Sequence, residues 1–242
     1  MDLPWKKDGT DSVTQSVSEP KTGQIDLTGG ERVKQMPRRV FLGLLGGAAA
    51  LGVIAPGIQA KLAGSVVGGA VGLDGYQIYT VTGGIPTFDP ATYRLRVDGM
   101  VRRPLSLGLH QLGALRADTL HATFQCVTGW QVPNQVFGGV NLSRLLENAS
   151  PLPGARYLNF YSFDGTYTES LPIRVALGPA AMVVTHLDGK PLSANHGAPV
   201  RLFVDHYYGY KSIKWLSRIE ASSQPITGYW EHYGYPENAK IG

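Results

Sequence analysis

Residues 124–130 read FQCVTGW, and this stretch contains Cys126, the only cysteine among the 242 residues of the chain. A single cysteine forms no disulfide within its own chain, and most free cysteines are small apolar core residues. Here the thiol follows a phenylalanine and lies in a Thr-Gly segment, where a backbone turn would present the sulfur to a cavity. Thiolates suit soft or high-valent metals and need positive or metallic neighbours to stay deprotonated. The segment therefore predicts a metal ligand, with a buried structural thiol as the alternative.

A later block, residues 195–214, contains much of the remaining Arg, Lys and His chemistry. Arg201 lies within an apolar strand pattern, where a charge needs a partner. Its planar guanidinium suits a phosphate, which it can grip with two parallel hydrogen bonds. Lys214 adds a point charge, and a turn at Ser212 offers backbone N–H donors. The block predicts a site for an anionic cofactor, and the alternative is a buried pair of Arg201 with Asp205 beside ordinary surface lysines.

The composition indicates a globular, turn-rich fold with many strands. The chain is 43% hydrophobic and 17% charged, and it contains 31 glycines and 16 prolines. These values favour a strand-rich α+β domain over a helical bundle. The net charge of +4 is modest and no Lys/Arg stripe is present, so nucleic acid is not an expected partner. No glycine-rich loop leads from a strand into a helix, which excludes a dinucleotide-binding domain.

Alternation of apolar and polar residues predicts the strands, and spacings of three and four predict the short helices. The predicted strands cover residues 77–81, 93–99, 122–126, 157–163, 166–170, 182–185, 200–204 and 213–219. The predicted helices cover residues 106–115, with a cap at Ser106, and residues 140–146 and 171–177.

The first 60 residues predict an export signal that could also act as a membrane anchor. Residues 1–36 are polar, without periodicity, and are expected to be disordered. Residues 37–60 begin with Arg38-Arg39 before Phe-Leu, which resembles a twin-arginine export signal, and continue as an apolar run long enough to cross a bilayer. Positive charges precede the run, so the part after it is expected outside the cytoplasm, whether the segment is cleaved or kept as an anchor. Residues 61–75 read as a linker to a single catalytic domain, residues 76–242.

Several ordered motifs resemble the sulfite-oxidase-type molybdopterin oxidoreductases. They are the cysteine segment 124–130, HGAPVR at 196–201 and YGYKSIKWLSRIE at 208–220, together with 93–107 and 228–230. The resemblance covers about residues 76–242 and implies the strand-rich, mixed molybdopterin-binding fold of that family. It also implies a molybdenum–molybdopterin cofactor. The twin-arginine route exports proteins that are already folded, commonly with a cofactor inserted, which agrees with a metal held by a lone thiolate.

The resemblance implies a role for each matching residue. Cys126 ligates molybdenum, beside the dithiolene sulfurs of the pterin and oxo or hydroxo groups. Tyr235 assists electron and proton transfer, and His232 is a further candidate for moving a proton, with an exposed surface role as its alternative. The pterin and its phosphate are held by residues spread along the chain: Thr82, Ser162, His196, Arg201, Ser212, Ile213 and Lys214.

Two departures from the family pattern bear on the substrate. Sulfite oxidases place arginines around the oxyanion where this chain has Thr82 and Gln131, and an anion without guanidinium partners binds weakly. The chain is therefore more similar to the exported bacterial branch that reduces sulfoxides, including methionine sulfoxide in proteins, with electrons from a membrane partner. The expected activity is oxygen-atom transfer that reduces a small-molecule or protein-bound S-oxide or N-oxide, by a membrane-associated enzyme. The alternatives are sulfite oxidation with the same cofactor and a non-catalytic, membrane-tethered binding domain.

Overall fold

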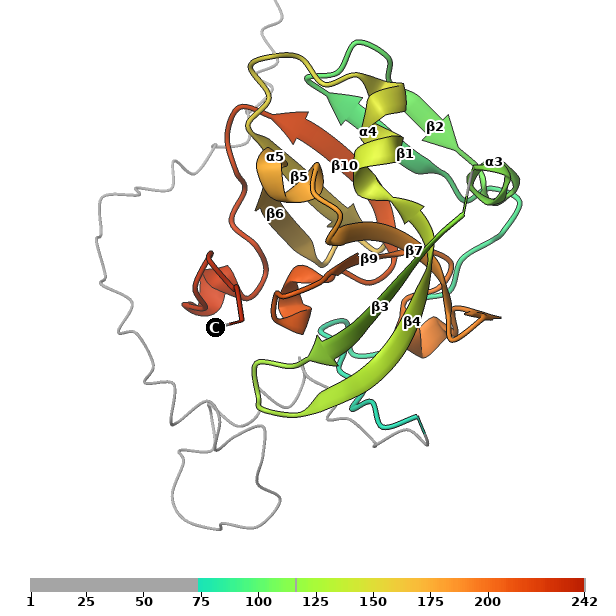
Figure 1. Cartoon of the computed structure of the whole chain (residues 1–242), viewed down its shortest axis with the longest axis vertical. Helices are drawn as coiled ribbons and strands as arrows, with labels where there is room; N and C mark the ends of the chain where they lie inside the picture. The colour runs from blue at the N-terminus through green and yellow to red at the C-terminus, as the bar shows by residue number, and fades with distance from the viewer. Residues whose placement is uncertain (1–73, 116, 242) are drawn as a thin grey trace, which may run out of the picture. The chain divides into compact units, whose positions relative to one another are not determined.

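The computed structural model describes residues 74–115 and 117–241, and their strands form two five-stranded sheets. The first sheet has the order β2 (Leu105–Leu107), β1 (Leu95–Gly99), β10 (Leu216–Ser222), β5 (Tyr157–Ser162) and β6 (Thr168–Pro172). The second has the order β3 (Asp118–Gln125), β4 (Gln131–Asn141), β7 (Ala181–Leu187) and β8 (Lys190–Pro191), with β9 (Arg201–Val204) also paired to β7. Figure 1 shows the first sheet above the long β3–β4 hairpin.

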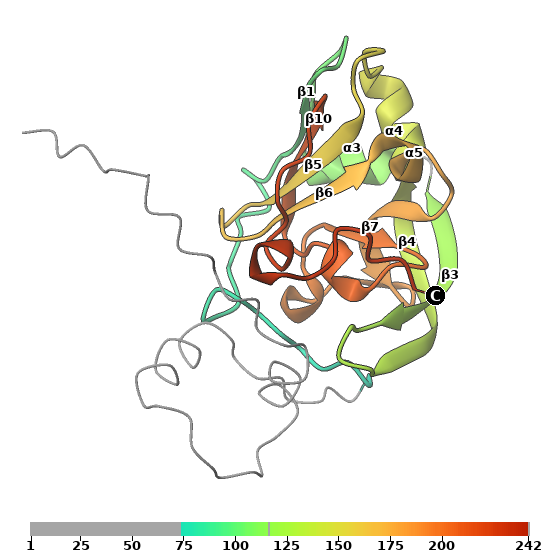
Figure 2. The same ribbon diagram turned by 90° about the vertical axis from the view of Figure 1, so that its left-hand side faces the viewer.

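Short helices and turns connect the strands. They are α3 (Leu109–Ala114), α4 (Leu142–Ala149) and α5 (Ile173–Ala176), and the 3₁₀ turns η1 (Ala194–His196), η2 (Gly209–Lys211) and η3 (Glu231–Tyr233). Figure 2 shows the first sheet along one side and the β3–β4 hairpin along the other, with C-terminal turns between them. This strand-rich, mixed α+β architecture is the predicted fold class.

No helix within the described ranges is long and apolar enough to cross a membrane. The predicted disordered tail, residues 1–36, and the predicted signal or anchor, residues 37–60, lie outside the described residues. The predicted linker, residues 61–75, is described only at its last two positions.

The first sheet is built around the parallel pair of β1 and β10. Leu95 and Val97 of β1 are fully buried, whereas Arg96 between them is exposed, as the alternation predicted. The remaining neighbours in this sheet pair antiparallel. On the outer face Arg218 of β10 binds Asp98 of β1 at 2.9 Å. The side chains of this ion pair are 28% and 31% exposed, so it is a half-exposed contact of small energetic weight.

Helix α4 covers the core of the first sheet with one apolar face. Leu142, Leu145 and Leu146 are fully buried, and their spacings of three and four place them on one side of the helix. Asn141 caps the helix, because its side-chain oxygen accepts a hydrogen bond of 2.9 Å from the Ser143 amide. The predicted helix at 140–146 is therefore confirmed, although it begins and ends later.

A second core cluster lies under the cysteine segment. The rings of Phe137 on β4 and Phe203 on β9 stack with centroids 3.7 Å apart. Phe124 is buried in the same cluster, with Cys126 and Trp130 packed against it. The strand predicted to lead into the thiol is confirmed as the end of β3, where Phe124 is the buried residue, so the cysteine follows directly from a paired strand.

Three predicted elements differ from the structure. Residues 77–81 form no strand and instead extend as a segment with isolated bridge residues. Residues 105–107 pair with β1 as β2, so α3 begins later than predicted and its N-cap is Gly108 rather than Ser106. The strand predicted over 213–219 begins only at Leu216, because the preceding residue, Trp215, has a positive φ of 55°.

We predict that Leu145→Ala lowers the free energy of unfolding by about 2–5 kcal/mol, because it deletes a fully buried side chain and leaves a cavity under α4. The matched control is Leu177→Ala, since Leu177 is 51% exposed and the change should stay within about 0.5 kcal/mol. Urea unfolding of the two variants in the same cofactor state measures both values. Equal losses would contradict the packing described for α4.

Candidate cofactor and active site

The loop after β3 presents Cys126 to a cavity. The Cys126 amide donates to the Trp130 carbonyl at 2.9 Å, and the Gly129 amide donates to the Cys126 carbonyl at 3.1 Å. Gly129 has φ of +103°, which closes this tight turn. The Thr128 hydroxyl donates to Cys126 Sγ at 3.2 Å and orients the sulfur. The turn predicted to present the thiol is therefore present.

The cavity measures about 150 Å³ and brings together most of the predicted site residues. Its lining is mainly aromatic and apolar, with a few polar groups at separate places. The predicted residues that line it are Cys126, His196, Arg201, Ser212, Ile213, Lys214 and Tyr235.

Arg201 is a buried cation held by backbone carbonyls. Its side chain donates to the carbonyls of Leu202 at 3.3 Å, His196 at 3.1 Å and Ser212 at 3.0 Å. No ion pair joins Arg201 to a carboxylate within residues 74–115 and 117–241, and Asp205 instead binds the neighbouring His206. The alternative of a buried Arg201–Asp205 pair is therefore wrong. A guanidinium has five N–H donors, so the three carbonyls leave donors available for an anion in the cavity.

Lys214 is the second cation of the cavity without a carboxylate in the described part of the chain. Its ammonium donates to the carbonyls of Tyr79 at 2.6 Å and Asn195 at 3.3 Å. Burial, and next the charge of Arg201, lower the pKa of Lys214 to about 7. Gly197 lets its main chain lie close to the Lys214 side chain, because a Cβ on Gly197 would lie only 2.8 Å from the Cβ of Lys214. Two like charges in one low-dielectric site favour a bound anion.

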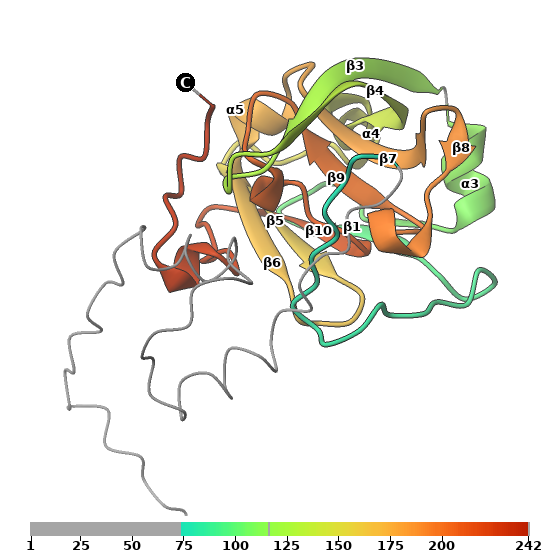
Figure 3. The same cartoon turned by 90° about the horizontal axis from the view of Figure 1, so that it is seen from below.

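The first described segment closes the cavity beside the two cations. In Figure 3 this segment, drawn in teal, passes across the view of β9 and β10. The Lys214 contact to the Tyr79 carbonyl attaches it there. Tyr76 is 3% exposed, and its phenolic oxygen has no hydrogen-bond partner among the described residues. Burial raises the pKa of Tyr76, so this phenol remains a donor inside the cavity.

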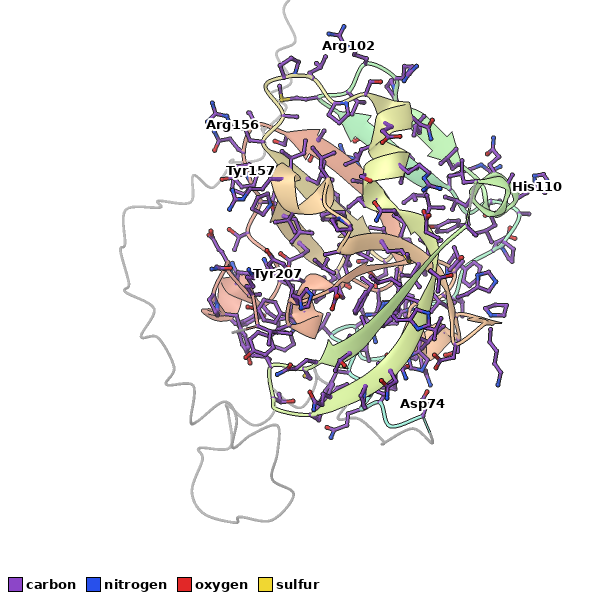
Figure 4. The ribbon with its side chains drawn as sticks, viewed as in Figure 1. Asp74, Arg102, His110, Arg156, Tyr157 and Tyr207 are labelled. Carbon is purple, nitrogen blue, oxygen red and sulfur yellow. The ribbon has the colours of Figure 1, made fainter. Side chains whose placement is uncertain are left out.

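His196 is a neutral, buried ring at the same end of the cavity. Its Nε2 lies 2.7 Å from a carboxylate oxygen of Asp74, which Figure 4 labels near the start of the described chain. Burial lowers the pKa of His196, against the hydrogen bond to Asp74. The ring also packs edge-on against Tyr76, with centroids 4.7 Å apart. At neutral pH the positive charge of the cavity is therefore supplied by Arg201 and by the protonated fraction of Lys214.

Ser212 and Ile213 contribute mainly through their backbone. The Ser212 hydroxyl accepts a hydrogen bond of 3.1 Å from the Val204 amide, and its carbonyl accepts one from Arg201. Ile213 is 1% exposed, and its carbonyl accepts from the Leu202 amide at 2.9 Å. The two residues thus fasten the loop before β10 to β9, which places Lys214 at the cavity.

Tyr235 lies among aromatic rings at another part of the cavity wall. Its ring centroid is 5.5 Å from those of Tyr210 and Trp230, and all three side chains line the cavity. His232 is exposed and does not line the cavity, so the structure places it on the surface. The loop at η2 approaches closely, since a Cβ on Gly209 would lie 2.4 Å from the Phe124 ring.

Thr82 and Ser162 do not line this cavity. The Thr82 hydroxyl bonds with Thr80 at 2.7 Å and donates to the Gly84 carbonyl at 2.5 Å, which holds a local turn. The Ser162 hydroxyl accepts from the Tyr167 amide at 3.0 Å and lies 2.5 Å from Asp164, which closes the β5–β6 hairpin. Both hydroxyls are thus engaged in turns of the fold, although their partners Thr80 and Tyr167 line the cavity.

Sequence reasoning missed several aromatic residues of the cavity. Tyr76 is the first residue of the predicted catalytic domain and Tyr79 lies in a predicted strand, and Trp130 and Tyr210 were only parts of motifs. Tyr79 and Cys126 line the same cavity, and burial, followed by the charge of Cys126, raises the pKa of Tyr79. The one signal in the sequence was the density of aromatic residues around each motif, and it does not say which rings face inward.

The donor set fits a large anionic cofactor that carries a soft metal. One thiol, two cations without carboxylate partners and a buried phenol without a partner line one cavity. Within the described ranges no group of three or more His, Cys, Asp or Glu side chains could hold a metal ion. A metal here would take one protein sulfur and its other ligands from the cofactor.

Comparison with protein families matches residues 82–230 to the oxidoreductase molybdopterin binding domain. The oxidoreductase YuiH of Bacillus subtilis, described as uncharacterized, is 31% identical over 155 residues, which cover 64% of this chain and 78% of that protein. The protein-methionine-sulfoxide reductase catalytic subunit MsrP of Campylobacter jejuni is 27% identical over 62% of this chain and 56% of its own. Sulfite oxidase of Arabidopsis thaliana is 28% identical over 63% of this chain and 48% of its own. This chain thus matches about half the length of the last two relatives.

The crystal structure of the sulfane dehydrogenase SoxCD from Paracoccus pantotrophus superimposes with a TM-score of 0.59. The match covers 86% of this chain and 58% of that chain at 19% identity, so it shows a shared fold. The family match covers more than half of the chain and includes Cys126 and both buried cations of the cavity. The chain therefore belongs to the oxidoreductase molybdopterin binding domain family, whose cofactor the motifs had implied.

Proposed function

We propose that this oxidoreductase transfers an oxygen atom at a molybdenum ligated by Cys126 and reduces S-oxides or N-oxides outside the cytoplasm. The observation that supports the proposal is the cavity that joins the single thiol to Arg201 and Lys214, two buried cations without carboxylate partners in the described chain. A pterin phosphate would supply the missing negative charge. The bound cofactor would supply the two-electron chemistry, while the protein sets its position, charge balance and access.

Each residue of the cavity has a separate task in this proposal. Cys126 supplies the protein ligand to the metal, oriented by the Thr128 hydroxyl. Arg201 and Lys214 neutralise the phosphate, and Tyr76 and His196 offer polar contacts to the ring system. Tyr235, at the aromatic part of the wall, would donate a proton to the oxygen that leaves the substrate. The overall reaction consumes two electrons and two protons per oxide and releases water.

The charge distribution of the cavity favours a neutral substrate over sulfite. Arg201 and Lys214 are its cationic side chains among the described residues, and both are assigned to the cofactor. Thr82 and Gln131, at the positions where sulfite oxidases have arginines, do not line the cavity. A neutral S-oxide needs no guanidinium partner, and an aromatic wall suits its apolar substituents. Sulfite oxidation remains the second candidate, since sulfite oxidases are among the relatives.

The place of action and the electron source are also part of the proposal. The Arg38-Arg39 signature and the apolar run after it support export to the outer face of the cell membrane, with or without retention as an anchor. A membrane protein would then supply the electrons. The MsrP and YedZ1 relatives are named as subunits of methionine-sulfoxide reductases, which agrees with a multi-subunit electron path.

We expect Cys126→Ser to fold but to lose at least about 100-fold in kcat with S-oxide substrates, because the only cysteine ligand is replaced by a harder oxygen donor. Thr128→Val is the matched comparison, since it keeps the ligand and removes one donor to Sγ. The loss of kcat in Thr128→Val should be about tenfold or less. X-ray absorption should show one sulfur fewer around molybdenum in Cys126→Ser alone. Full activity with normal molybdenum content in Cys126→Ser would rule out the ligand assignment.

Lys214 predicts a pH dependence of anion binding to the cofactor-free full-length chain. Its folded pKa of about 7 lies below the usual value of 10.5, so the unfolded chain binds the extra proton between these values and stability rises with pH across that window. A bound anion raises this pKa again, so binding above the folded pKa must take up a proton. Sulfate, whose charge is constant here, should bind about tenfold more weakly at about pH 8.5 than at about pH 6.5.

Thermal shift titrations with sulfate measure this difference. Lys214→Met should lose the pH dependence together with most of the affinity, whereas Lys190→Met, at an exposed position on β8, should keep both. A pH dependence unchanged in Lys214→Met would show that another group binds the anion.

The direction of the reaction is tested with artificial electron carriers on the molybdenum-loaded enzyme. We expect kcat/KM for a dialkyl S-oxide or a methionine-sulfoxide peptide with a reduced dye to exceed that for sulfite with an oxidised dye by at least about 100-fold, because no spare guanidinium faces the cavity. Faster turnover of sulfite would establish the second candidate instead.

A further inference from the structure

Three charged side chains are buried together on the other side of the aromatic wall. Lys211 donates to Glu169 at 2.7 Å and also binds the carboxylate of Glu231. The three side chains are 3%, 0% and 3% exposed and come from η2, β6 and η3. One oxygen of each carboxylate has no hydrogen-bond partner in the described chain. The cluster thus carries one more carboxylate than ammonium, away from water.

The cluster lies directly behind residues that line the proposed active site. Tyr210 precedes Lys211, Trp230 precedes Glu231, and both rings line the Cys126 cavity. On the opposite side all three charged residues line a second cavity of about 320 Å³. Tyr157 and Tyr207, labelled in Figure 4, also line this second cavity. The ion cluster therefore lies between the two cavities and fastens the wall that separates them.

The segment 228–235, which carries Trp230 and Tyr235, is attached to the rest of the domain by ring contacts, a backbone hydrogen bond and the ion cluster. The Tyr229 ring stacks on Tyr167 with centroids 5.3 Å apart, and the Tyr235 ring packs against Tyr210 at 5.5 Å. The Tyr229 amide donates to the Thr168 carbonyl at 2.9 Å, and Glu231 enters the ion cluster. Gly228 brings the main chain over the carboxylates, since a Cβ there would lie 2.2 Å from a Glu231 oxygen. Within the described residues, the ion pair is the one charged contact that joins this segment to β6 and η2.

We propose that Glu169, Lys211 and Glu231 are positioning residues that hold Trp230 and Tyr235 against the cavity, and that one proton on the carboxylate pair keeps this attachment firm. The inference rests on the proposed function, because it assigns the aromatic wall to the substrate end of that cavity. The three residues do not touch the cavity themselves and act through their neighbours in sequence.

The carboxylate pair has room for one proton, because one oxygen of each carboxylate has no hydrogen-bond partner in the described chain, and we assign this proton to Glu169. The ionisable groups around it are Lys211, Glu231 and the phenol of Tyr167, with Arg174 and Glu237 at the second cavity. Burial raises the pKa of Glu169 to about 8, opposed by Lys211 and reinforced by Glu231. Its usual value is 4.5, so the folded chain binds the extra proton between these pH values and stability falls as pH rises through them. Above the folded pKa two carboxylates share one ammonium, and their repulsion weakens the hold on Glu231.

Hydrogen exchange on the molybdenum-loaded, full-length enzyme tests this assignment without turnover. Glu231→Leu leaves Lys211 and Glu169 as a neutral pair but releases the segment, so amides of residues 229–235 should exchange at least about tenfold faster. KM for the S-oxide should rise more than kcat falls. Glu231→Gln keeps the shape and one acceptor and should restore most of both values. Asp98→Asn, in the half-exposed pair on the first sheet, should change neither.

The pH profile provides a second, independent measurement. After correction for intrinsic exchange, protection of residues 229–235 in the wild-type enzyme should decrease, and KM increase, as pH rises through about 8. Glu169→Gln, which mimics the protonated carboxyl, should remove both changes. A folded Glu231→Leu enzyme with unchanged exchange and KM would overturn the proposal. If that variant does not fold, a wild-type pH profile in Glu169→Gln overturns it.

Failure of the proposed function is distinguishable from failure of this inference. Absence of S-oxide turnover in wild-type enzyme that contains molybdenum refutes the substrate assignment. The exchange of residues 229–235 still decides whether the ion cluster holds the segment.

Discussion

The constraint on which the rest of the site depends is positive charge buried without a carboxylate to balance it. Arg201 and Lys214 are held by backbone carbonyls, which orient the cations but leave their charge uncompensated. Removing an ion from water costs several kcal/mol even after the protein relaxes. Meeting these carbonyls requires β9, the turn before it, the loop before β10 and the first described segment to converge on one point. The fold around the cavity is thus organised for an anion that compensates both charges.

The molecule separates this excess of positive charge from an excess of negative charge by a layer of aromatic rings. Tyr210 and Trp230 lie on the cavity side, and Lys211 and Glu231, the next residues in sequence, lie on the other. In a 3₁₀ turn successive side chains point in different directions. η2, and η3 together with the residue before it, therefore each place one side chain on the cavity side of the wall and the next on the opposite side. A wall of this kind keeps the buried carboxylates away from the anionic cofactor, where like charges would repel. The same residues therefore set both the shape and the charge of the site.

Much of the fold was predictable from the sequence because its strands are short alternating or apolar runs bounded by turn residues. The patterns at 93–99, 157–163, 166–170 and 182–185 were confirmed as strands of the two sheets, and the spacing of the leucines predicted helix α4. The errors fall where tertiary contacts override local pattern. Residues 77–81 alternate like a strand but lie against Lys214, and Trp215, with a left-handed backbone, delays the start of β10. No window of sequence contains these long-range contacts.

The site was predicted in part for a similar reason. Cys126, Arg201 and Lys214 were identifiable as unusual residue types in apolar surroundings, and the structure brings them to one cavity. Thr82 and Ser162 were not separable from turn residues, because hydroxyls that close turns look the same in sequence. The buried carboxylates escaped notice, since nothing in the local pattern marks Glu169 or Glu231 as buried and four strands, β7 to β10, lie between them in sequence. The parallel pairing of β1 with β10 has a final consequence for biogenesis. Arg218 meets Asp98 across 120 residues of chain, so the ribosome must release nearly the whole polypeptide before the central strands of the first sheet can come together.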